Sequence, residues 1–274
     1  MTEIAAPPHP FDAAVALEPA EDDGHTRGRT SPEYTNMVGP FGGVTAAALL
    51  RAVQQHPDRL GDPISLTVNY AGPVADGEFD ITVRAVRTNR TNQHWLLELT
   101  QDGMVTTTAT AVFGTRRDTW SDTELDVPEV PPAETVPART FPDFIAWARN
   151  YEMRFVEGAV PEQDAGEHPD STTTLWVRDA PVRPLDFPAL TALCDVFYPR
   201  VFLRRGRYMP AGTVSLTVYF HADAAQLDAQ GDDFVLGTAR THRFSQGYFD
   251  QAAQLWSRDG TLLATSHQLV YFKD

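Results

Sequence analysis

An internal repeat constrains the fold of this chain more than any other feature. The segment 64–70 (ISLTVNY) returns 150 residues later as 214–220 (VSLTVYF). In both copies apolar residues alternate with polar ones, which is the period of a strand with one buried face. The sequence therefore predicts two copies of one structural unit.

Each copy has a helix-like run before this strand and further strands after it. The first run, Gly42–Gln55, is apolar over most of its circumference, so a sheet should wrap around it. The second run is 186–198, in which Asp186 suits the N-cap and Pro188 the first turn. The remaining strands are expected at 79–86, 94–100 and 105–113, and at 234–240, 250–256 and 262–272, with hairpin turns at Asp102-Gly103 and Asp259-Gly260.

A nearly all-apolar helix followed by antiparallel strands that curl around it is the hot-dog arrangement. We therefore expect an α+β fold, a tandem (double) hot-dog with two long apolar helices, each wrapped by an antiparallel sheet. Additional strands are expected at 150–156 and 172–177. The acidic, proline-rich segment PEVPPAETVP favours an extended, poorly packed connector. The predicted domains are an N-terminal hot-dog (25–118), a linker (119–140) and a C-terminal hot-dog (141–274).

The charge of the chain disfavours several classes of partner. Its 22 basic and 37 acidic residues give a formal net charge of −15, which repels nucleic acid phosphates and anionic membrane surfaces. The single cysteine, Cys194, cannot form an internal disulfide. The start MTEIAAPPHPFD does not have the features of a signal peptide and is expected to be a loose arm. We expect a soluble, cytoplasmic protein with neither nucleic acid nor membrane as a partner.

Asp195 is the first candidate for chemistry. It is the only charged residue between Asp186 and Arg200, in a run whose other residues should face a core. A carboxylate in that setting needs hydrogen-bond donors to offset its desolvation. The alternative is that Asp195 lies on the exposed stripe of an amphipathic helix, and the composition leaves both readings open.

Four segments resemble the acyl-CoA thioesterase II family, double hot-dog enzymes that cleave fatty acyl-CoA. They are ALCDVFYPR, AGTVSLTVYFH, LLATSHQLVYF and, in the first half, GPFGGVTAAALL. In that family an Asp, a Ser or Thr and a Gln hold the attacking water. The resemblance therefore implies that Asp195, Thr213 and Gln268 hold a water that hydrolyses acyl-CoA, without cofactor or metal. It also raises the expectation that double hot-dog protomers associate into homo-oligomers.

Strand periodicity gives different expectations for two of these residues. Gln268 alternates with Val270 on an apolar face, where a buried amide needs hydrogen-bond partners. By strict alternation Thr213 shares a face with Ser215, opposite Val214, although the first residue of a strand is often twisted away from that pattern. A threonine favoured only by its strand propensity is the alternative for Thr213.

Thioester hydrolysis requires a base, an aimed water and donors for the developing oxyanion. Asp195 is the expected base, and partial burial would help by raising its pKa toward neutrality. Backbone amides at a helix start can polarise a carbonyl, and glycine lets the substrate approach closely. We therefore expect Gly42 and Gly43 to bind the oxyanion.

The two copies are not chemically equivalent. Ala111 occupies the position that matches Gln268, and Pro63 the position that matches Thr213. The first helix-like run also has no acidic residue before Asp58. The sequence thus predicts one active site per chain, with acid–base groups from the second half and backbone donors from the first.

A basic cluster follows the Asp195 segment and could bind the phosphates of coenzyme A. We expect Arg204 and Arg205 to make these contacts, and a solvated loop face is the alternative. The cluster consists of Arg200, Arg204, Arg205 and Arg207.

Two other functions are considered. A hot-dog enoyl-CoA hydratase pairs an Asp with a His five residues later, where this chain has Arg200. A catalytically inactive acyl-CoA binding module is compatible with the same fold. The eight histidines show no metal-binding spacing, and His221, His267 and Cys194 are expected to be packed or surface residues. The acyl chain length is not predicted.

Overall fold

The computed structural model describes residues 7–19 and 24–274. Its helices are α1 (Pro10–Ala14), α2 (Gly42–Gln55), α3 (Phe187–Leu193), α4 (Arg200–Arg205) and α5 (Ala224–Gln230), with 3-10 turns η1 (Pro32–Tyr34), η2 (Ala133–Thr135) and η3 (Ala146–Asn150). The strands of the first half are β1 (Glu18–Pro19), β2 (His25–Arg29), β3 (Asp62–Tyr70), β4 (Glu78–Thr88), β5 (Asn92–Gln101) and β6 (Met104–Gly114). Those of the second half are β7 (Tyr151–Glu157), β8 (Thr173–Asp179), β9 (Ala211–Phe220), β10 (Val235–Arg240), β11 (Phe244–Ser245), β12 (Tyr248–Trp256) and β13 (Leu262–Phe272).

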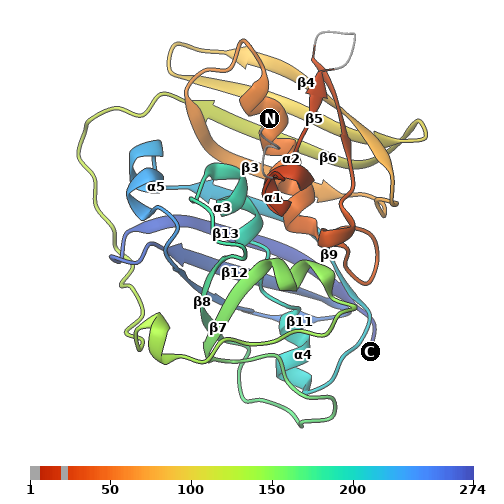
Figure 1. The fold of residues 1–274 in the computed structure, drawn as a ribbon, viewed down its shortest axis with the longest axis vertical. Helices are drawn as coiled ribbons and strands as arrows, with labels where there is room; N and C mark the ends of the chain where they lie inside the picture. The colour runs from red at the N-terminus through yellow and green to blue at the C-terminus, as the bar shows by residue number, and fades with distance from the viewer. Residues whose placement is uncertain (1–6, 20–23) are drawn as a thin grey trace, which may run out of the picture.

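The thirteen strands formed by the described residues belong to one antiparallel sheet. The order is β1-β2-β4-β5-β6-β3-β9-β13-β12-β10-β8-β7, and β11 pairs with β12 off this path. The two halves meet where β3 pairs with β9 (Figure 1). The expected α+β double hot-dog fold is therefore confirmed, and every predicted strand is present close to its predicted bounds.

Strand β2 was not predicted from the sequence. Its residues, HTRGR, lack the alternation of apolar and polar side chains that identifies a half-buried strand. In the structure β2 pairs with β4, just as β8 pairs with β10 in the second half. Strand β2 is held by this backbone pairing and by ion pairs of Arg27 with Asp80 and of Arg29 with Glu78.

An approximate two-fold axis relates the two halves and passes between Thr67 and Thr217. These residues are direct partners in the β3–β9 pairing, and their hydroxyl oxygens are 3.1 Å apart. The strand order β2-β4-β5-β6-β3 on one side of the axis corresponds to β8-β10-β12-β13-β9 on the other. This correspondence supports the duplication predicted from the repeat.

Two β-bulges occur at equivalent places in both halves. The register shifts at Ile64 in β3 and at Val214 in β9. It shifts again at Thr106 in β6 and at Leu263 in β13. Bulges bend a strand locally and are retained as features of a family rather than as defects. The shared irregularities are a second line of evidence for an internal duplication.

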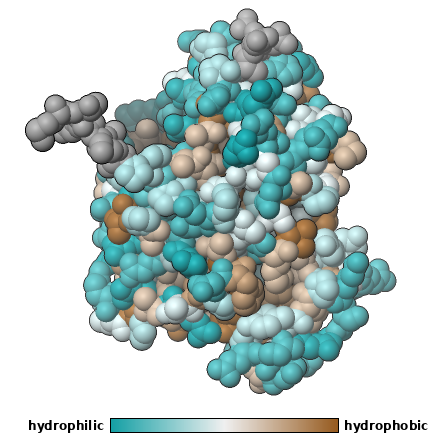
Figure 2. All heavy atoms as spheres, turned by 45° about the vertical axis from the view of Figure 1, so that its right-hand side comes forward, coloured by the Kyte–Doolittle hydropathy of each residue, from teal (hydrophilic) through white to brown (hydrophobic). Residues whose placement is uncertain are grey.

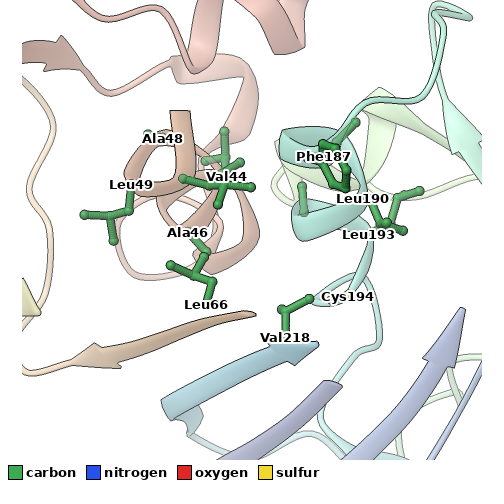
Figure 3. Close-up of a cluster of buried hydrophobic side chains, with 14 of the residues drawn as sticks. Val44, Ala46, Ala48, Leu49, Leu66, Phe187, Leu190, Leu193, Cys194 and Val218 are labelled. Carbon is green, nitrogen blue, oxygen red and sulfur yellow. The ribbon is translucent and has the colours of Figure 1, made fainter. Parts of the chain in front are cut away.

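Helices α2 and α3 lie side by side over the central strands (Figures 1 and 3). Every residue of α2 from 43 to 50 is buried, which agrees with the prediction of an enclosed apolar helix. Alanine and leucine favour the helix, and the small alanines also allow neighbouring elements to approach closely. Leu66 of β3 and Val218 of β9 lie beneath the two helices and are fully buried.

Helix α3 is shorter than the run predicted at 186–198, so the expectation of two long helices is wrong for the second half. The Asp186 carboxylate caps its start by accepting the Ala189 N–H at 2.9 Å, as predicted. The helix ends at Leu193, before a β-branched and two aromatic residues with weak helix propensity and before Pro199, which disfavours helix in the residue preceding it. Asp195 therefore lies in a turn after α3 rather than on a helix.

The amino-terminal arm was predicted to be loose as far as residue 12, but it packs against the rest of the protein from Pro10 onward. Residues 1–6 of the expected loose arm lie outside the described residues. From Pro10 the chain forms α1, and Phe11 is fully buried with its ring 6.1 Å from that of Tyr34. The apolar side chain of Phe11 explains why the arm is held at this point.

The segment between the halves is extended, as predicted. All of residues 115–132 are described, and none lies in a helix or strand. Its end is not poorly packed, however, because Ala133 and Val136 are buried against Trp176 and Trp256 of the second half. The division into 25–118, 119–140 and 141–274 stays a prediction, since one hydrophobic core includes residues of both halves.

One face of the surface is drawn in Figure 2, and it is largely hydrophilic. On the face drawn in Figure 2, hydrophobic residues form small, separate areas among polar ones. Within the described ranges no helix combines the length and hydropathy that a membrane span requires.

The close approach of α2 to α3 gives a test at Gly43. A Cβ atom there would lie 2.8 Å from the Ala192 carbonyl oxygen and 2.6 Å from the Phe41 ring. Replacing a helical glycine by alanine normally stabilises a helix by about 1 kcal/mol. Here we expect Gly43→Ala to lower the free energy of unfolding by about 1–3 kcal/mol, because the backbone of α3 must move.

Urea denaturation of the full chain measures this change, with Arg51→Ala in the same helix as a control. We expect the control to change stability by less than about 0.5 kcal/mol. A Gly43→Ala variant as stable as the original chain would show that the two helices are not in tight contact.

Candidate active site

The three side chains predicted to act together form one hydrogen-bonded chain. Thr213 Oγ1 donates to Gln268 Oε1 at 3.0 Å, and Gln268 Nε2 donates to Asp195 Oδ1 at 2.9 Å. Gln268 Nε2 also lies 3.4 Å from the Cys194 carbonyl oxygen. These contacts fix the direction of the Gln268 amide and point its N–H group at the carboxylate.

A β-bulge explains how Thr213 reaches this site. Strict alternation predicted that Thr213 faces the same side as Ser215, and this expectation is wrong. Val270 of β13 is opposite Thr213 and Leu269 is opposite Ser215, so Val214 is left without a partner. The extra residue turns Thr213 to the face of the buried Val270, which is also the face of Gln268.

The start of α2 lies against the Asp195 carboxylate. A Cβ atom on Gly42 would be 2.8 Å from Asp195 Oδ2, so only glycine fits there without displacing the carboxylate. The backbone N–H of Gly43 favours the charged form of the carboxylate. The role of Gly43 as a donor to the oxyanion of the substrate stays a prediction.

Burial makes Asp195 a stronger base than an ordinary aspartate. The surrounding protein desolvates the carboxylate and raises its pKa to about 7, although the hydrogen bonds from Gln268 and Gly43 favour the charged form. Asp195 and Thr213, taken as whole residues, are partly exposed. The Asp195 carboxyl can change protonation near neutral pH.

Tyr70 is a residue of this site that the sequence analysis missed. Its hydroxyl donates to the Gly42 carbonyl oxygen at 2.8 Å, and burial, followed by the negative charge of Asp195, raises its pKa well above the ordinary value. The matching residue of the second half is Phe220, which has no hydroxyl. That difference between the repeats was the available signal. Tyr70 holds the start of α2 in place beside the carboxylate.

Arg204 and Arg205, on α4, are not among the hydrogen-bond partners of the Asp195 site. Arg204 donates to the His168 carbonyl oxygen at 2.6 Å. Arg205 forms ion pairs with Glu167 at 3.0 Å and with Asp274 at 2.9 Å. Both arginines line a separate hollow of about 220 Å³ together with Val201, Phe244 and Phe272.

Arg200 does not belong to the predicted basic surface cluster. It is fully buried, and its guanidinium stacks over the Tyr198 ring with 4.2 Å to the ring centroid. Its Nε donates to Gln251 Oε1 at 3.1 Å, and Gln251 is paired with Gln268 across β12 and β13. The expectation of a surface role for Arg200 is therefore wrong; it packs the sheet beside Gln268.

Cys194 is a core residue. Its side chain is fully buried, and this burial raises the pKa of the thiol well above the ordinary value. A thiolate nucleophile is disfavoured there, which agrees with the prediction from the sequence.

The register confirms which residues of the first half match the site. Ala111 is opposite Leu66 in the β6–β3 pairing, as Gln268 is opposite Leu216 in β13–β9. Pro63 directly precedes the bulge of β3, as Thr213 precedes the bulge of β9. The first half thus carries neither the amide nor the hydroxyl at these positions.

Comparison with known families follows the division into repeats. A model of the acyl-CoA thioesterase N-terminal domain matches residues 31–114, and one of the C-terminal domain matches residues 126–272. The chain belongs to the acyl-CoA thioesterase family. As a member of that family it is a thioester hydrolase. A search of curated proteins finds no significant match.

Solved structures show the same fold over the full length of this thioesterase. A hot-dog protein of unknown function from Alicyclobacillus acidocaldarius is 50% identical, with a TM-score of 0.92 over 97% of this chain and 99% of that one. A putative thioesterase II from Thermobifida fusca is 20% identical, with a TM-score of 0.85 over 98% and 99% of the two chains. An acyl-CoA thioesterase II from Mycobacterium marinum is 17% identical, with a TM-score of 0.76 over 96% and 98%.

The raised pKa of Asp195 makes stability depend on pH in a defined direction. Because the folded pKa of about 7 lies above the ordinary value of 3.8, the neutral carboxyl is favoured in the folded state, and stability is lost as the pH rises from about 4 through about 7. Asp195→Asn removes this loss. Between about pH 5 and about pH 8.5 we expect the variant to gain about 2 kcal/mol in free energy of unfolding relative to the original chain.

Urea denaturation at both pH values tests this, with Asp228→Asn on the exposed side of α5 as the matched control. The control should show no such pH-dependent gain. Equal pH dependence in the original chain and in Asp195→Asn would mean that Asp195 ionises as an ordinary aspartate.

Proposed function

We propose that this protein hydrolyses acyl-CoA thioesters to the free acid and coenzyme A, with Asp195 as the general base. The observation that carries the proposal is the chain Thr213–Gln268–Asp195, which ends at a carboxylate whose pKa is raised to about 7. A base with that pKa is about half ionised at pH 7 and accepts a proton far more readily than an ordinary aspartate.

The reaction balances with one water and one carboxyl. The water oxygen attacks the thioester carbonyl carbon while Asp195 accepts a proton from that water. This step gives a tetrahedral oxyanion. Collapse of this intermediate breaks the carbon–sulfur bond, and the leaving thiolate takes the proton back from the Asp195 carboxyl. The products are the acid and the free thiol of coenzyme A, and the carboxylate is restored.

The neighbouring groups have separate tasks in this scheme. Gln268 aims the carboxylate and can contact the water through its amide, and Thr213 fixes the orientation of that amide. The Gly42 and Gly43 N–H groups, at the positive end of α2, are our candidate donors to the oxyanion. Tyr70 is a positioning residue that holds this helix start through the Gly42 carbonyl.

Other parts of the proposal rest on the family resemblance. We place the reaction in cytoplasmic fatty acid metabolism and expect one active site per chain, in the second half. Association of double hot-dog protomers stays an expectation. The acyl chain length is best measured with a panel of acyl-CoA substrates.

The central test measures thiol release from acetyl-, octanoyl- and palmitoyl-CoA. We expect Asp195→Asn to lower kcat/KM by about 100-fold or more on the best substrate, because general base catalysis contributes at least that factor. Thr213→Val and Gln268→Ala should cause smaller losses. In the original enzyme kcat/KM should rise about tenfold per pH unit below pH 7 and level off above it, since the base must be ionised.

Asp228→Asn and Cys194→Ala are the controls for this test, and both should retain activity. Full activity of Asp195→Asn would show that Asp195 is not the general base. Binding of acyl-CoA without thiol release would instead support an inactive binding module.

A second test concerns the coenzyme A phosphates. We propose that Arg204 and Arg205 attract them to the hollow at α4, where both side chains are 37% exposed despite their ion pairs. Arg204→Glu combined with Arg205→Glu should raise KM for acyl-CoA and leave KM unchanged for a short thioester without the nucleotide. An equal effect on both substrates would mean that the arginines act through folding rather than through phosphate binding.

A further inference from the structure

Three potential metal ligands gather on the outer face of the second half, opposite the Asp195 site. They are His242, in the connection from β10 to β11, Asp250 of β12 and His267 of β13. One ligand atom from each lies within 4.8 Å of the other two. Among the described residues this is the one such group of three.

The pairing of β12 and β13 places two of these side chains. Asp250 is opposite Leu269, and His267 lies two residues before Leu269 on the same face of β13. The Asp250 Oδ2 atom is 3.1 Å from His267 Nε2 and 2.5 Å from His242 Nδ1. One carboxylate oxygen therefore meets both imidazoles.

The backbone fixes the direction of this carboxylate. Asp250 Oδ1 accepts the N–H groups of His242 at 3.1 Å and of Arg243 at 3.0 Å. These two backbone bonds hold the carboxylate in place, with Oδ2 presented to the histidines.

We propose that His242, Asp250 and His267 form a binding site for a divalent transition metal, with Zn²⁺ the best-fitting ion. Two imidazole nitrogens and one carboxylate oxygen suit zinc, whereas Mg²⁺ and Ca²⁺ prefer sites made of oxygen ligands. The fourth coordination position is open to solvent, because the two histidine side chains are 54% and 57% exposed.

The geometry requires only small side-chain movements. Ligand atoms around a tetrahedral zinc ion are about 3.3 Å apart, given metal–ligand distances near 2.0–2.1 Å. The ligand atoms are now between 2.5 Å and at most 4.8 Å apart. Movements of the exposed imidazole nitrogens by about 1 Å would bring all three ligand atoms to the distances that zinc requires. This inference is independent of the hydrolase proposal, because the three side chains face away from Gln268, the chain neighbour of His267.

Isothermal titration of the untagged full chain with ZnSO₄ tests the site directly. We expect one Zn²⁺ per chain, and about tenfold or greater loss of affinity in His242→Ala and in His267→Ala. His221→Ala is the matched control, since it removes an exposed histidine that bonds to Thr265, two residues from His267 on β13. The control should bind zinc as the original chain does, and MgSO₄ should give no saturable binding.

Thermal unfolding gives a second readout, because an ion that binds only the folded state raises Tm. Zn²⁺ should raise Tm in the original chain and in His221→Ala, but not in His242→Ala or His267→Ala. Because the substituted histidines are exposed, each variant should have the same Tm as the original chain when no metal is present. This measurement shows whether the variant folds. The proposal would be overturned if the original chain showed no saturable zinc binding, or if His242→Ala and His267→Ala bound zinc as tightly as the original chain does.

Discussion

The pairing of β3 with β9 is the constraint on which the rest of the molecule depends. It joins two half-sheets into one, and it places α2 of the first half beside α3 of the second. Gly43 permits this approach, since a side chain there would meet the Ala192 carbonyl. The same geometry brings the start of α2 against Asp195, so the candidate site exists only where the two halves meet.

The site illustrates how a desolvated carboxylate is kept usable. Removing Asp195 from water favours its neutral form, and the Gln268 amide and the Gly43 N–H partly offset that cost. Gln268 can do so because Thr213 occupies its carbonyl oxygen, which leaves the amide nitrogen to face the acid. A residue with no ionisable group thereby favours the charged form of its neighbour and partly opposes the effect of burial.

Much of the fold could be predicted because periodicity survives in the two copies of the β3-type strand, and the hairpin turns recur. Local irregularities could not be predicted. The bulge at Val214 reverses the face of Thr213, and the end of α3 depends on a turn that Asp195 makes toward α2. Strand pairing between distant segments produces the contacts of Arg200 and brings His242 close to His267. No local sequence motif predicts either of them. The resemblance supplied the three proposed catalytic residues, which periodicity alone left open.

Covalent fusion of the repeats changes how such a molecule can evolve. In a symmetric pair of identical subunits, every substitution appears on both sides of the axis. Here Pro63 and Ala111 differ from their counterparts Thr213 and Gln268, and Tyr70 has a hydroxyl that its counterpart Phe220 lacks. One side is free to specialise as scaffold and the other as chemistry, a division of labour that a homodimer encoded by a single copy cannot reach.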